Sequence, residues 1–466
     1  MGIYKQCDIC GDASTELNAD LYRRWGLALG LKLKPHAKFV VGGDNRSSTP
    51  EFLKALMDGL CQAGLDVVNV GQLPTPMIYH ARHRLRADGC AVVTASHNPA
   101  NINGLKWMIG NRPPMPDDVQ VLKTAAEKSP PKKLKRTRTQ ARQLDVSFDY
   151  VANLQETWVD AMGTHQHIVL DPMHGCWAGK ARRYLHAVFP QCLISSINDT
   201  PDPTFADLAP NCAHTHQLHD LCDAVYRERA HLGIAFDGDG DQITLIDNHG
   251  VVLTAEETAW LLMETFGRAM RKERFVYDQT FSDHVFQRAK QLGAEAIIEQ
   301  SVHTIIHNRM IATNALLGVE ADGHYFYRAL EGGDDGLYTA CRIIAFLART
   351  DKSLAQWRSK CPAMYITPIL NVGTSIDSQP RIMEKIRQAW SSFPQRDFDG
   401  VRIDTPGGWI LVRSSNSEPY LSFHFESLDW SALSHLVLRF CESIPDLGEE
   451  LWDSYISAMG MEGYRK

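Results

Sequence analysis

The sequence has no uninterrupted hydrophobic run of about 18 residues, the length that a membrane-spanning helix needs. The segment from Met1 to Cys10 also lacks the apolar stretch of a secretory signal. We therefore expect a protein of the cytoplasm. The 11 cysteines are an odd number, which argues against a closed disulfide framework and for reduced thiols. Cys7 and Cys10 form one C-x-x-C motif, but no second pair follows at zinc-finger spacing.

Neither sign of charge dominates the chain, because 48 Lys and Arg stand against 55 Asp and Glu, a net charge of -7. This balance makes nucleic acid an unpromising partner. The basic run at 132–138 has no interleaved aromatic residues on which bases could stack, so it is typical of a solvated connector.

The chain does have material for large hydrophobic cores. It is 466 residues long and 44% hydrophobic, with 10 Trp, 14 Tyr and 17 Phe. This length and composition predict several folded domains rather than a disordered protein.

A strand–helix–strand pattern occurs three times. The first strands are Lys38–Val41, His167–Leu170 and Arg274–Tyr277; the helices are Glu51–Ala63, Ala178–Phe189 and Ser282–Leu292; the second strands are Leu65–Val70, Cys192–Ile197 and Ala294–Ile298. Short β-rich runs followed by helical periodicity indicate βαβ units. We expect three related α/β domains with mixed sheets.

Each unit offers one further strand that leads into a small, polar loop. These strands are Cys90–Val93, Leu232–Phe236 and Leu316–Val319. Ligands of open α/β sheets lie beyond the carboxyl ends of the strands. The three loops are therefore expected to face one central cleft.

The pattern changes beyond about residue 367. A helix over Arg381–Trp390 and strands over Val401–Ile403, Trp409–Val412 and Tyr420–Glu426 predict a smaller α+β domain. The expected domains are 1–148, 149–253, 254–364 and 365–466. The last contains Arg413-Ser414-Ser415-Asn416-Ser417-Glu418-Pro419, whose donors suit a phosphate, although the loop alone is equally compatible with a plain polar turn.

The second polar loop carries Asp237, Asp239 and Asp241, separated by glycines. Glycine lets the chain fold tightly enough to turn three carboxylates toward one point, where a hard cation such as Mg²⁺ can bind. The alternative is a solvated acidic turn.

The first polar loop presents Ser96, which is a candidate nucleophile or phosphoryl carrier, or else an ordinary turn residue. Lys106 is a candidate proton carrier if burial or a nearby cation lowers its pKa; otherwise it is a surface lysine. In the third loop, Glu320 can accept hydrogen bonds from sugar hydroxyls, and His324 can meet a phosphate or a proton. His303 could join them, although each histidine alone is more typical of a structural role.

Four motifs occur in a specific order: Thr94-Ala95-Ser96-His97-Asn98-Pro99, Asp237-Gly238-Asp239-Gly240-Asp241, Glu320-x-x-Gly323-His324 and Arg413-x-Ser415-Asn416-Ser417-Glu418-Pro419. In this order they resemble the α-D-phosphohexomutase family, and the resemblance covers nearly the whole chain. Asn416 is similar to the phosphomannomutase/phosphoglucomutase branch.

The resemblance implies a mutase that interconverts hexose 1-phosphate and hexose 6-phosphate, with mannose or glucose as the sugar. It implies that Ser96 is a phosphoserine, that Asp237, Asp239 and Asp241 hold Mg²⁺ against its phosphate, and that a hexose 1,6-bisphosphate is the intermediate. It further implies a set of substrate and proton-transfer residues: Lys106, His303, Glu320, Asp322, His324, Arg413, Ser415, Asn416 and Ser417. The expected partner is a small phosphosugar rather than nucleic acid or a membrane, and the expected state is a monomer or weak dimer.

Four positions depart from the family pattern. Cys10 and Gln242 stand where arginine is usual, Thr280 where lysine is usual, and Asp322 where serine is usual. Because a bisphosphate carries close to four negative charges, the lost cations are expected to weaken its retention. The alternatives are a mutase for another phosphosugar, a noncatalytic or impaired phosphosugar-binding protein, and a phosphatase that uses the aspartate loop as its nucleophile.

Overall fold

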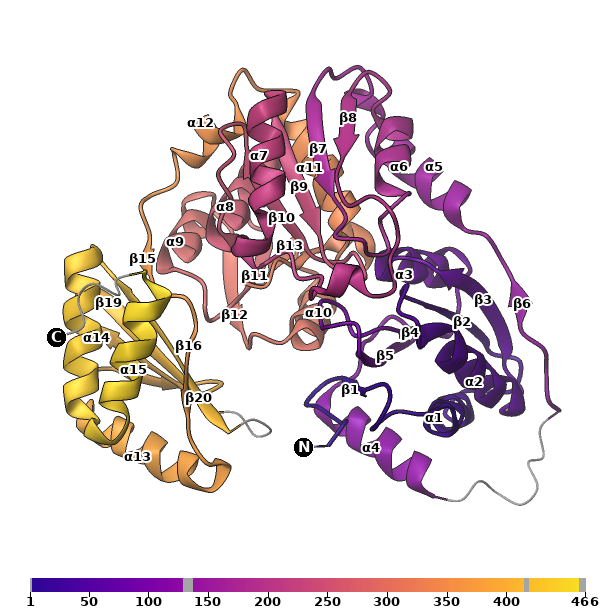
Figure 1. Ribbon diagram of the computed structural model, residues 1–466, viewed down its shortest axis with the longest axis horizontal. Helices are drawn as coiled ribbons and strands as arrows, with labels where there is room; N and C mark the ends of the chain where they lie inside the picture. The colour runs from indigo at the N-terminus through magenta and orange to yellow at the C-terminus, as the bar shows by residue number, and fades with distance from the viewer. Residues whose placement is uncertain (1, 129–136, 415–418, 461–466) are drawn as a thin grey trace. The chain divides into compact units, whose positions relative to one another are not determined.

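The computed structural model describes the chain except for residues 1, 129–136, 415–418 and 461–466 (Figure 1). Its described residues form two compact units. The large unit comprises residues 2–278 and 288–361, and the small unit comprises residues 279–287 and 362–466. The expected phosphate-loop residues Ser415, Asn416 and Ser417 lie outside the described residues.

The first sheet of the large unit has the strand order β1-β5-β4-β2-β3-β6. Its strands are β1 (Ile9–Asp12), β2 (Lys38–Gly43), β3 (Asp66–Gln72), β4 (Gly89–Val93), β5 (Ile102–Ile109) and β6 (Arg142–Gln143). Strands β2, β3 and β4 run parallel, whereas β5 is antiparallel to β4 and β1. The helices are α1 (Ala19–Leu31), α2 (Thr49–Gln62), α3 (Thr75–Arg84) and α4 (Pro116–Glu127). The sheet is therefore mixed, as expected.

Two four-stranded sheets follow, ordered β10-β9-β7-β8 and β12-β11-β13-β14. Their strands are β7 (His167–Asp171), β8 (Leu193–Ser196), β9 (Leu232–Phe236), β10 (Ile243–Asp247), β11 (Arg274–Asp278), β12 (Glu295–Glu299), β13 (Leu317–Val319) and β14 (Tyr325–Tyr327). In each sheet three strands are parallel and one edge strand is antiparallel. The accompanying helices are α5 (Ser147–Thr157), α6 (Ala181–Val188), α7 (His219–Glu228), α8 (Ala255–Phe266), α9 (Asp283–Gln291), α10 (His303–Thr313), α11 (Gly336–Leu347) and α12 (Leu354–Arg358).

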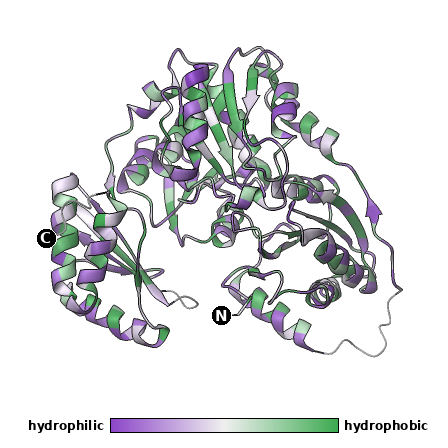
Figure 2. Ribbon diagram, viewed as in Figure 1, coloured by the Kyte–Doolittle hydropathy of each residue, from purple (hydrophilic) through white to green (hydrophobic). Residues whose placement is uncertain are grey.

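The strands that lead into the polar loops are hydrophobic throughout, because both faces of their sheets are covered. Every residue of β4 and of β9 is buried. The sheet interiors are accordingly apolar in Figure 2, whereas many helices carry both apolar and polar residues. These buried strands hold the loops that follow them in fixed positions.

The small unit contains an antiparallel sheet. Its order is β15-β20-β19-β18-β17, and β16 also pairs with β20. The strands are β15 (Tyr365–Ile366), β16 (Leu370–Gly373), β17 (Gln395–Asp397), β18 (Val401–Thr405), β19 (Gly408–Ser414) and β20 (Tyr420–Ser427), with helices α13 (Gln379–Ala389), α14 (Trp430–Ser443) and α15 (Pro445–Ala458). The expected fold class, three mixed α/β domains followed by an α+β domain, is confirmed.

A short segment from the middle of the chain belongs to the small unit. The Nε2 atom of Gln279 donates to the carbonyl oxygen of Asp399 at 2.9 Å, and Arg402 pairs with Asp283 at 2.6 Å. Ser282 also hydrogen-bonds Glu426. The small unit is therefore discontinuous in sequence.

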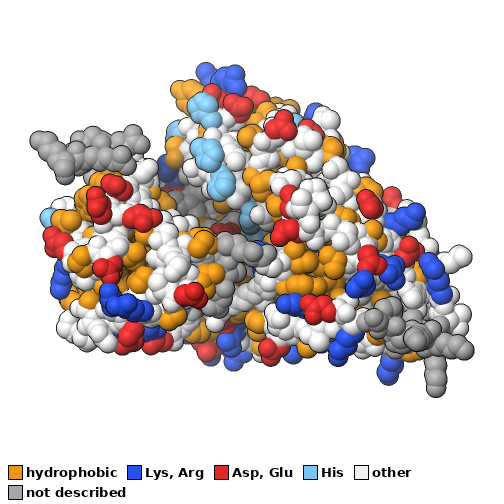
Figure 3. Space-filling model, turned by 60° about the horizontal axis from the view of Figure 1, so that its bottom comes forward, with side chains coloured by type: hydrophobic (Ala, Val, Ile, Leu, Met, Phe, Trp, Pro, Cys, Tyr) orange, Lys and Arg blue, Asp and Glu red, His pale blue; other side chains and the backbone are white. Residues whose placement is uncertain are grey.

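Among the described residues, no helix combines the length and the hydrophobicity that a membrane span requires. The structure has no disulfide bond among the 11 cysteines, all of which lie in the described part of the chain. Side chains of both charges are interspersed on the face drawn in Figure 3.

Candidate active site

The loop after β4 holds Ser96 against the loop after β9. Ser96 is 8% exposed, and its hydroxyl donates to Oδ2 of Asp237 at 2.9 Å. A methyl group on Gly238 would lie 2.7 Å from the carbonyl oxygen of Ser96, so only glycine fits at this approach. The serine and aspartate motifs therefore meet within the large unit.

The backbone of Ser96 has a left-handed conformation, with φ of 51°. A non-glycine residue pays a conformational cost there, which the surrounding contacts must offset. Arg46, which is fully buried, donates from one terminal nitrogen to the carbonyls of Ser96 and Asn98, each at 2.7 Å, and Asp44 holds its Nε at 2.8 Å. Arg46 therefore fixes the serine loop, a role that the sequence analysis did not assign.

The three aspartates of the second loop are almost fully buried, and their ligand atoms lie within 4.8 Å of one another. Lys106 bridges two of them, with its Nζ 2.9 Å from Asp239 Oδ2 and 2.7 Å from Asp241 Oδ2. The Oδ1 atoms of Asp239 and Asp241 are buried and make no hydrogen bond with the described protein. This donor set fits Mg²⁺, which prefers carboxylate oxygens.

The pKa values of Asp237 and Asp239 shift in opposite directions because their surroundings differ. Burial, followed by repulsion from Asp239 and Asp241, raises the pKa of Asp237 well above its usual range. Burial also acts to raise the pKa of Asp239, but Lys106 and the hydroxyl of Thr75 reverse that effect and lower it. Thr75 donates to Asp239 Oδ2 at 2.6 Å and was not singled out from the sequence.

The pKa of Lys106 is raised well above its ordinary value. Burial acts in the opposite direction, but attraction by Asp239 and Asp241 is stronger. The condition under which this lysine could readily release a proton, a lowered pKa, is therefore not met in this arrangement.

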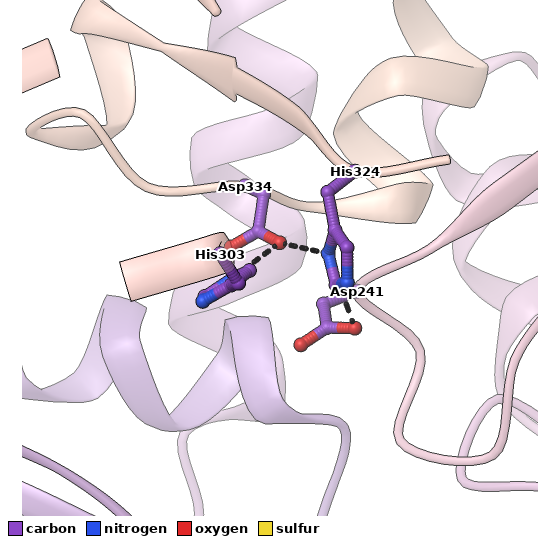
Figure 4. Close-up of side chains that lie close together, drawn as sticks. All are labelled: Asp241, His303, His324 and Asp334. Atoms are coloured by element: carbon purple, nitrogen blue, oxygen red, sulfur yellow. Dashed lines mark hydrogen bonds and ion pairs between the residues drawn. The ribbon is translucent and has the colours of Figure 1, made fainter. Parts of the chain in front are cut away.

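The two candidate histidines lie on one carboxylate, that of Asp334 (Figure 4). His303 begins α10, and its Nε2 lies 2.9 Å from Asp334 Oδ2. His324 lies before β14, and its Nδ1 is 2.6 Å from the same oxygen and 3.6 Å from Asp241 Oδ1. Asp241, His303, His324 and Asp334 also form a group with metal-ligand spacing. Asp334 was missed because neither its position nor its neighbours in the sequence mark it.

Gln242 contacts the other side of His324. Its Nε2 lies 2.9 Å from His324 Nε2, and backbone residues 242 and 324 form an isolated bridge. Burial lowers the pKa of His324, but Asp241 and Asp334 outweigh it and raise the pKa. Gln242, which stands where the resemblance leads us to expect arginine, thus contacts a candidate proton-transfer group.

The sugar-loop carboxylates have few partners. Glu320 is 3% exposed, and its Oε2 makes no hydrogen bond with the described residues. Burial, and then repulsion from Asp322, raise its pKa well above the usual range. Asp322 itself is exposed, and it also acts electrostatically on His97.

The departures Cys10 and Thr280, and the candidate phosphate ligand Arg413, lie elsewhere in the described chain. Cys10 is half-buried in β1, opposite Gly104 of β5. Thr280 and Arg413 belong to the small unit, where Arg413 pairs with Asp399 at 2.7 Å. Thr280 and Arg413 thus belong to a different unit from Ser96.

Comparisons with known proteins agree with this arrangement. Models of the phosphoglucomutase/phosphomannomutase α/β/α domains I, II and III match residues 2–130, 147–250 and 254–365. The chain is 29% identical over 430 residues to a phosphomannomutase/phosphoglucomutase of Pseudomonas aeruginosa, covering 91% of each chain. It is 27% identical over 473 residues to a phosphoglucomutase of Neisseria gonorrhoeae, covering 97% of this chain and 98% of that one.

A crystal structure of a phosphoglucomutase/phosphomannomutase family protein from Burkholderia thailandensis is similar throughout. It has a TM-score of 0.84 and 28% identity, covering 98% of this chain and 97% of that chain. The sequence matches and the shared fold agree with the resemblance carried by the four motifs. The chain belongs to the phosphoglucomutase/phosphomannomutase family, within the α-D-phosphohexomutases.

Proposed function

We propose that the protein interconverts hexose 1-phosphate and hexose 6-phosphate, of mannose or glucose, through phosphorylated Ser96. The observation that carries this proposal is the 2.9 Å contact of the Ser96 hydroxyl with Asp237, beside two further buried aspartates. A phosphoryl group on this oxygen would lie beside the carboxylates that can hold a cation.

The reaction consists of two phosphoryl transfers. The O–P bond of phosphoserine breaks as the free sugar hydroxyl forms a new O–P bond, and the proton of that hydroxyl passes to a nearby base. The resulting hexose 1,6-bisphosphate turns over, and its other phosphoryl group returns to Ser96. Positioning and charge neutralisation dominate such transfers.

The side chains around the serine have distinct roles in this proposal. Asp237, Asp239 and Asp241 would hold Mg²⁺, which would neutralise charge on the transferring phosphoryl group. A cation there would compete with Lys106 for Asp239 and Asp241, freeing the ammonium to meet phosphate oxygens. His303 and His324, both held by Asp334, are the candidate proton carriers.

Further residues are proposed to bind the sugar and its second phosphate. Glu320, which has an unpaired buried oxygen, would accept hydrogen bonds from sugar hydroxyls. Arg413, with Ser415, Asn416 and Ser417, would bind the phosphate that does not react. We place the protein in the cytoplasm as a monomer or weak dimer, divided at 148, 253 and 364 into four domains.

Intact-mass measurement of the purified protein tests the phosphoserine. We expect about 80 Da of extra mass, which Ser96→Ala removes. Incubation with Mg²⁺, a 1,6-bisphosphate and glucose or mannose 1-phosphate should then yield the 6-phosphate. A phosphatase would instead lose phosphate release in Asp237→Asn and keep it in Ser96→Ala, which would contradict the proposal.

A second candidate is a mutase for another phosphosugar, or a protein that binds phosphosugars without converting them. The exposed carboxylate of Asp322 beside Glu320 favours it, because the sugar loop gains a negative charge there. Gln242 and Cys10 also lack the charge of the arginines usual at these positions. Binding without conversion across a panel of hexose and aminohexose phosphates would favour the noncatalytic form.

A further inference from the structure

A second group of side chains with metal-ligand spacing lies beside the three-aspartate loop and shares one residue with it. Its members are Asp241, His303, His324 and Asp334, whose ligand atoms all lie within 4.8 Å of one another (Figure 4). They come from the loop after β9, the start of α10 and the two sides of β14. Two imidazoles with two carboxylates form a donor set different from the three carboxylates that suit Mg²⁺.

The spacing of these atoms fits a single four-coordinate ion. Ligand atoms about 2 Å from one tetrahedral ion lie roughly 3.3 Å from one another. His324 Nδ1 is 2.6 Å from Asp334 Oδ2 and 3.6 Å from Asp241 Oδ1. His303 Nε2 is 2.9 Å from the same Asp334 oxygen. The side chain of His303 is 18% exposed, so solvent reaches the group at this ring.

One oxygen of this group has no hydrogen-bond donor. Asp241 is only 1% exposed, and its Oδ1 makes no hydrogen bond with the described residues. Lys106 pairs with the other oxygen, Oδ2, at 2.7 Å, whereas Oδ1 faces the Nδ1 atom of His324 at 3.6 Å. Burying a carboxylate oxygen without a partner is costly, and a cation bound by this oxygen and the imidazole would remove that cost.

Gln242 can supply the hydrogen bond that a metal-bound histidine needs. Its Nε2 donates to His324 Nε2 at 2.9 Å, so in this arrangement the ring proton is on Nδ1 and faces Asp334. The Oε1 atom of Gln242 is buried and has no partner in the described chain. A half-turn of the amide would let Oε1 accept a proton from His324 Nε2, which leaves Nδ1 free for an ion. Histidines that bind a metal usually donate their other ring N–H to such an oxygen.

Arginine, which the resemblance leads us to expect at position 242, could not take this role. A guanidinium group can only donate, and it would add a positive charge beside the ring. Glutamine is neutral and can either donate or accept. This departure from the family pattern therefore favours a cation at His324.

We propose that Asp241, His303, His324 and Asp334 form a binding site for Zn²⁺. The two carboxylates balance the charge of the ion, and each ring binds as a neutral imidazole whose proton has moved to its other nitrogen. Imidazole ligands favour zinc over Mg²⁺. Bound zinc would hold both candidate proton carriers and should therefore inhibit the mutase reaction. This inhibition rests on the proposed function, whereas the metal site does not.

Anomalous diffraction from crystals of the full chain tests the site directly. The crystals are prepared with one equivalent of Zn²⁺ and without Mg²⁺, because Asp241 belongs to both metal groups. We expect a zinc peak in contact with the rings of His303 and His324. A peak only at the carboxylates of Asp237 and Asp239, or no peak, would overturn the proposal.

Competition with a zinc-binding dye measures the affinity of the site in solution. We expect at least about tenfold weaker binding in His303→Ala, which removes a partly exposed ligand, and about 10–100-fold weaker binding in Gln242→Met. His219→Ala is the matched control, because His219 also lies beside a carboxylate, that of Asp223, at 3.7 Å. Melting temperatures verify that the variants are folded. Equal affinity in the wild type and His303→Ala would overturn the site, and equal affinity in Gln242→Met would overturn the role of the amide.

Turnover assays test the inhibition. Zn²⁺ should inhibit the wild type, and Gln242→Met should need about tenfold more zinc for the same fractional loss of its own rate. Equal sensitivity of the two proteins would overturn the inhibitory role of this site. If the wild type converts no sugar phosphate, the proposed function fails, but the zinc peak still decides whether the metal site exists.

Discussion

The loop with Asp237, Asp239 and Asp241 and the loop with Glu320 and Asp322 differ in the partners that the protein gives to their carboxylates. Asp239 and Asp241 share Lys106, and Asp239 also accepts from Thr75 and Thr94. Glu320 has an oxygen that makes no hydrogen bond with the described chain, and exposed Asp322 raises its pKa further. A lysine and two hydroxyl donors partly offset the carboxylate charge of the first region, whereas one oxygen of Glu320 in the second has no donor among the described residues.

Removing the hydroxyl of Ser96 is expected to cause the largest loss of activity. We expect Ser96→Ala to lower kcat by about 10⁴-fold or more, because no other group can take up the phosphoryl group. Steady-state assays with a hexose 1-phosphate and its 1,6-bisphosphate measure this loss. Ser47→Ala, at a second serine of the first domain, is the control and should remain active. Turnover by Ser96→Ala near the wild-type rate would contradict the phosphoserine.

Removing the cation from the first region is expected to have the next largest effect. Lys106→Met leaves Asp239 and Asp241 buried without their ammonium partner, which costs about 3–5 kcal/mol of stability when a buried pair is broken. Mg²⁺ should then raise the melting temperature of this variant more than that of the wild type, as thermal denaturation would show. Lys54→Met, at an exposed lysine of α2, should respond like the wild type. An equal response in Lys106→Met would show that the lysine and the metal do not share carboxylates.

Neutralising Glu320 should raise the stability of the protein and lower its activity. The pKa of Glu320 is raised in the folded protein, so folding becomes less favourable as the pH rises above 4.5, the ordinary value. Glu320→Gln removes this penalty, and its melting temperature should exceed that of the wild type by about 2–4 °C at neutral pH.

The gain in Glu320→Gln should shrink as the pH falls toward 4.5, while kcat/KM is lower at every pH because the carboxylate acceptor is lost. Glu295→Gln, at an exposed glutamate, is the control. A variant less stable than the wild type at neutral pH would show that the glutamate is already satisfied.

The smallest effect is expected from the exposed carboxylate. Asp322→Ser removes a negative charge near Glu320 and His97, so KM for the anionic phosphate of an uncharged hexose should fall about three- to fivefold. Raising the salt concentration should reduce the difference between wild type and variant, because the carboxylate is exposed. A higher KM for hexose phosphates, with tighter binding of an aminohexose phosphate, would instead favour the second candidate function.

Much of the fold could be predicted because buried parallel strands leave a direct signal. The hydrophobic run Leu232–Phe236 ends at an aspartate and a glycine, and the structure has β9 at these residues, followed by the aspartate loop. The convergence of Ser96 and Asp237 followed from the rule that ligand loops lie beyond strand ends.

Other parts of the site depend on long-range contacts that no local sequence pattern predicts. Arg46 supports the serine loop from 50 residues away, and Asp334 joins His303 to His324 only after α10 and β14 have packed. The raised pKa of Lys106 likewise depends on two carboxylates from a later sheet. The roles of the phosphate-loop residues, and the expected domain boundaries, remain predictions.

The segment 279–287 belongs to the small unit although more than 70 residues of the large unit follow it in the chain. During synthesis, the ion pair between Asp283 and Arg402 can form only after Arg402 has left the ribosome. A fragment containing only residues 362–466 would lack the partners of Arg402 and Glu426, so we expect it to be less stable than the same unit within the full chain. A shortened protein is thus better made by joining the two stretches than by cutting the chain once.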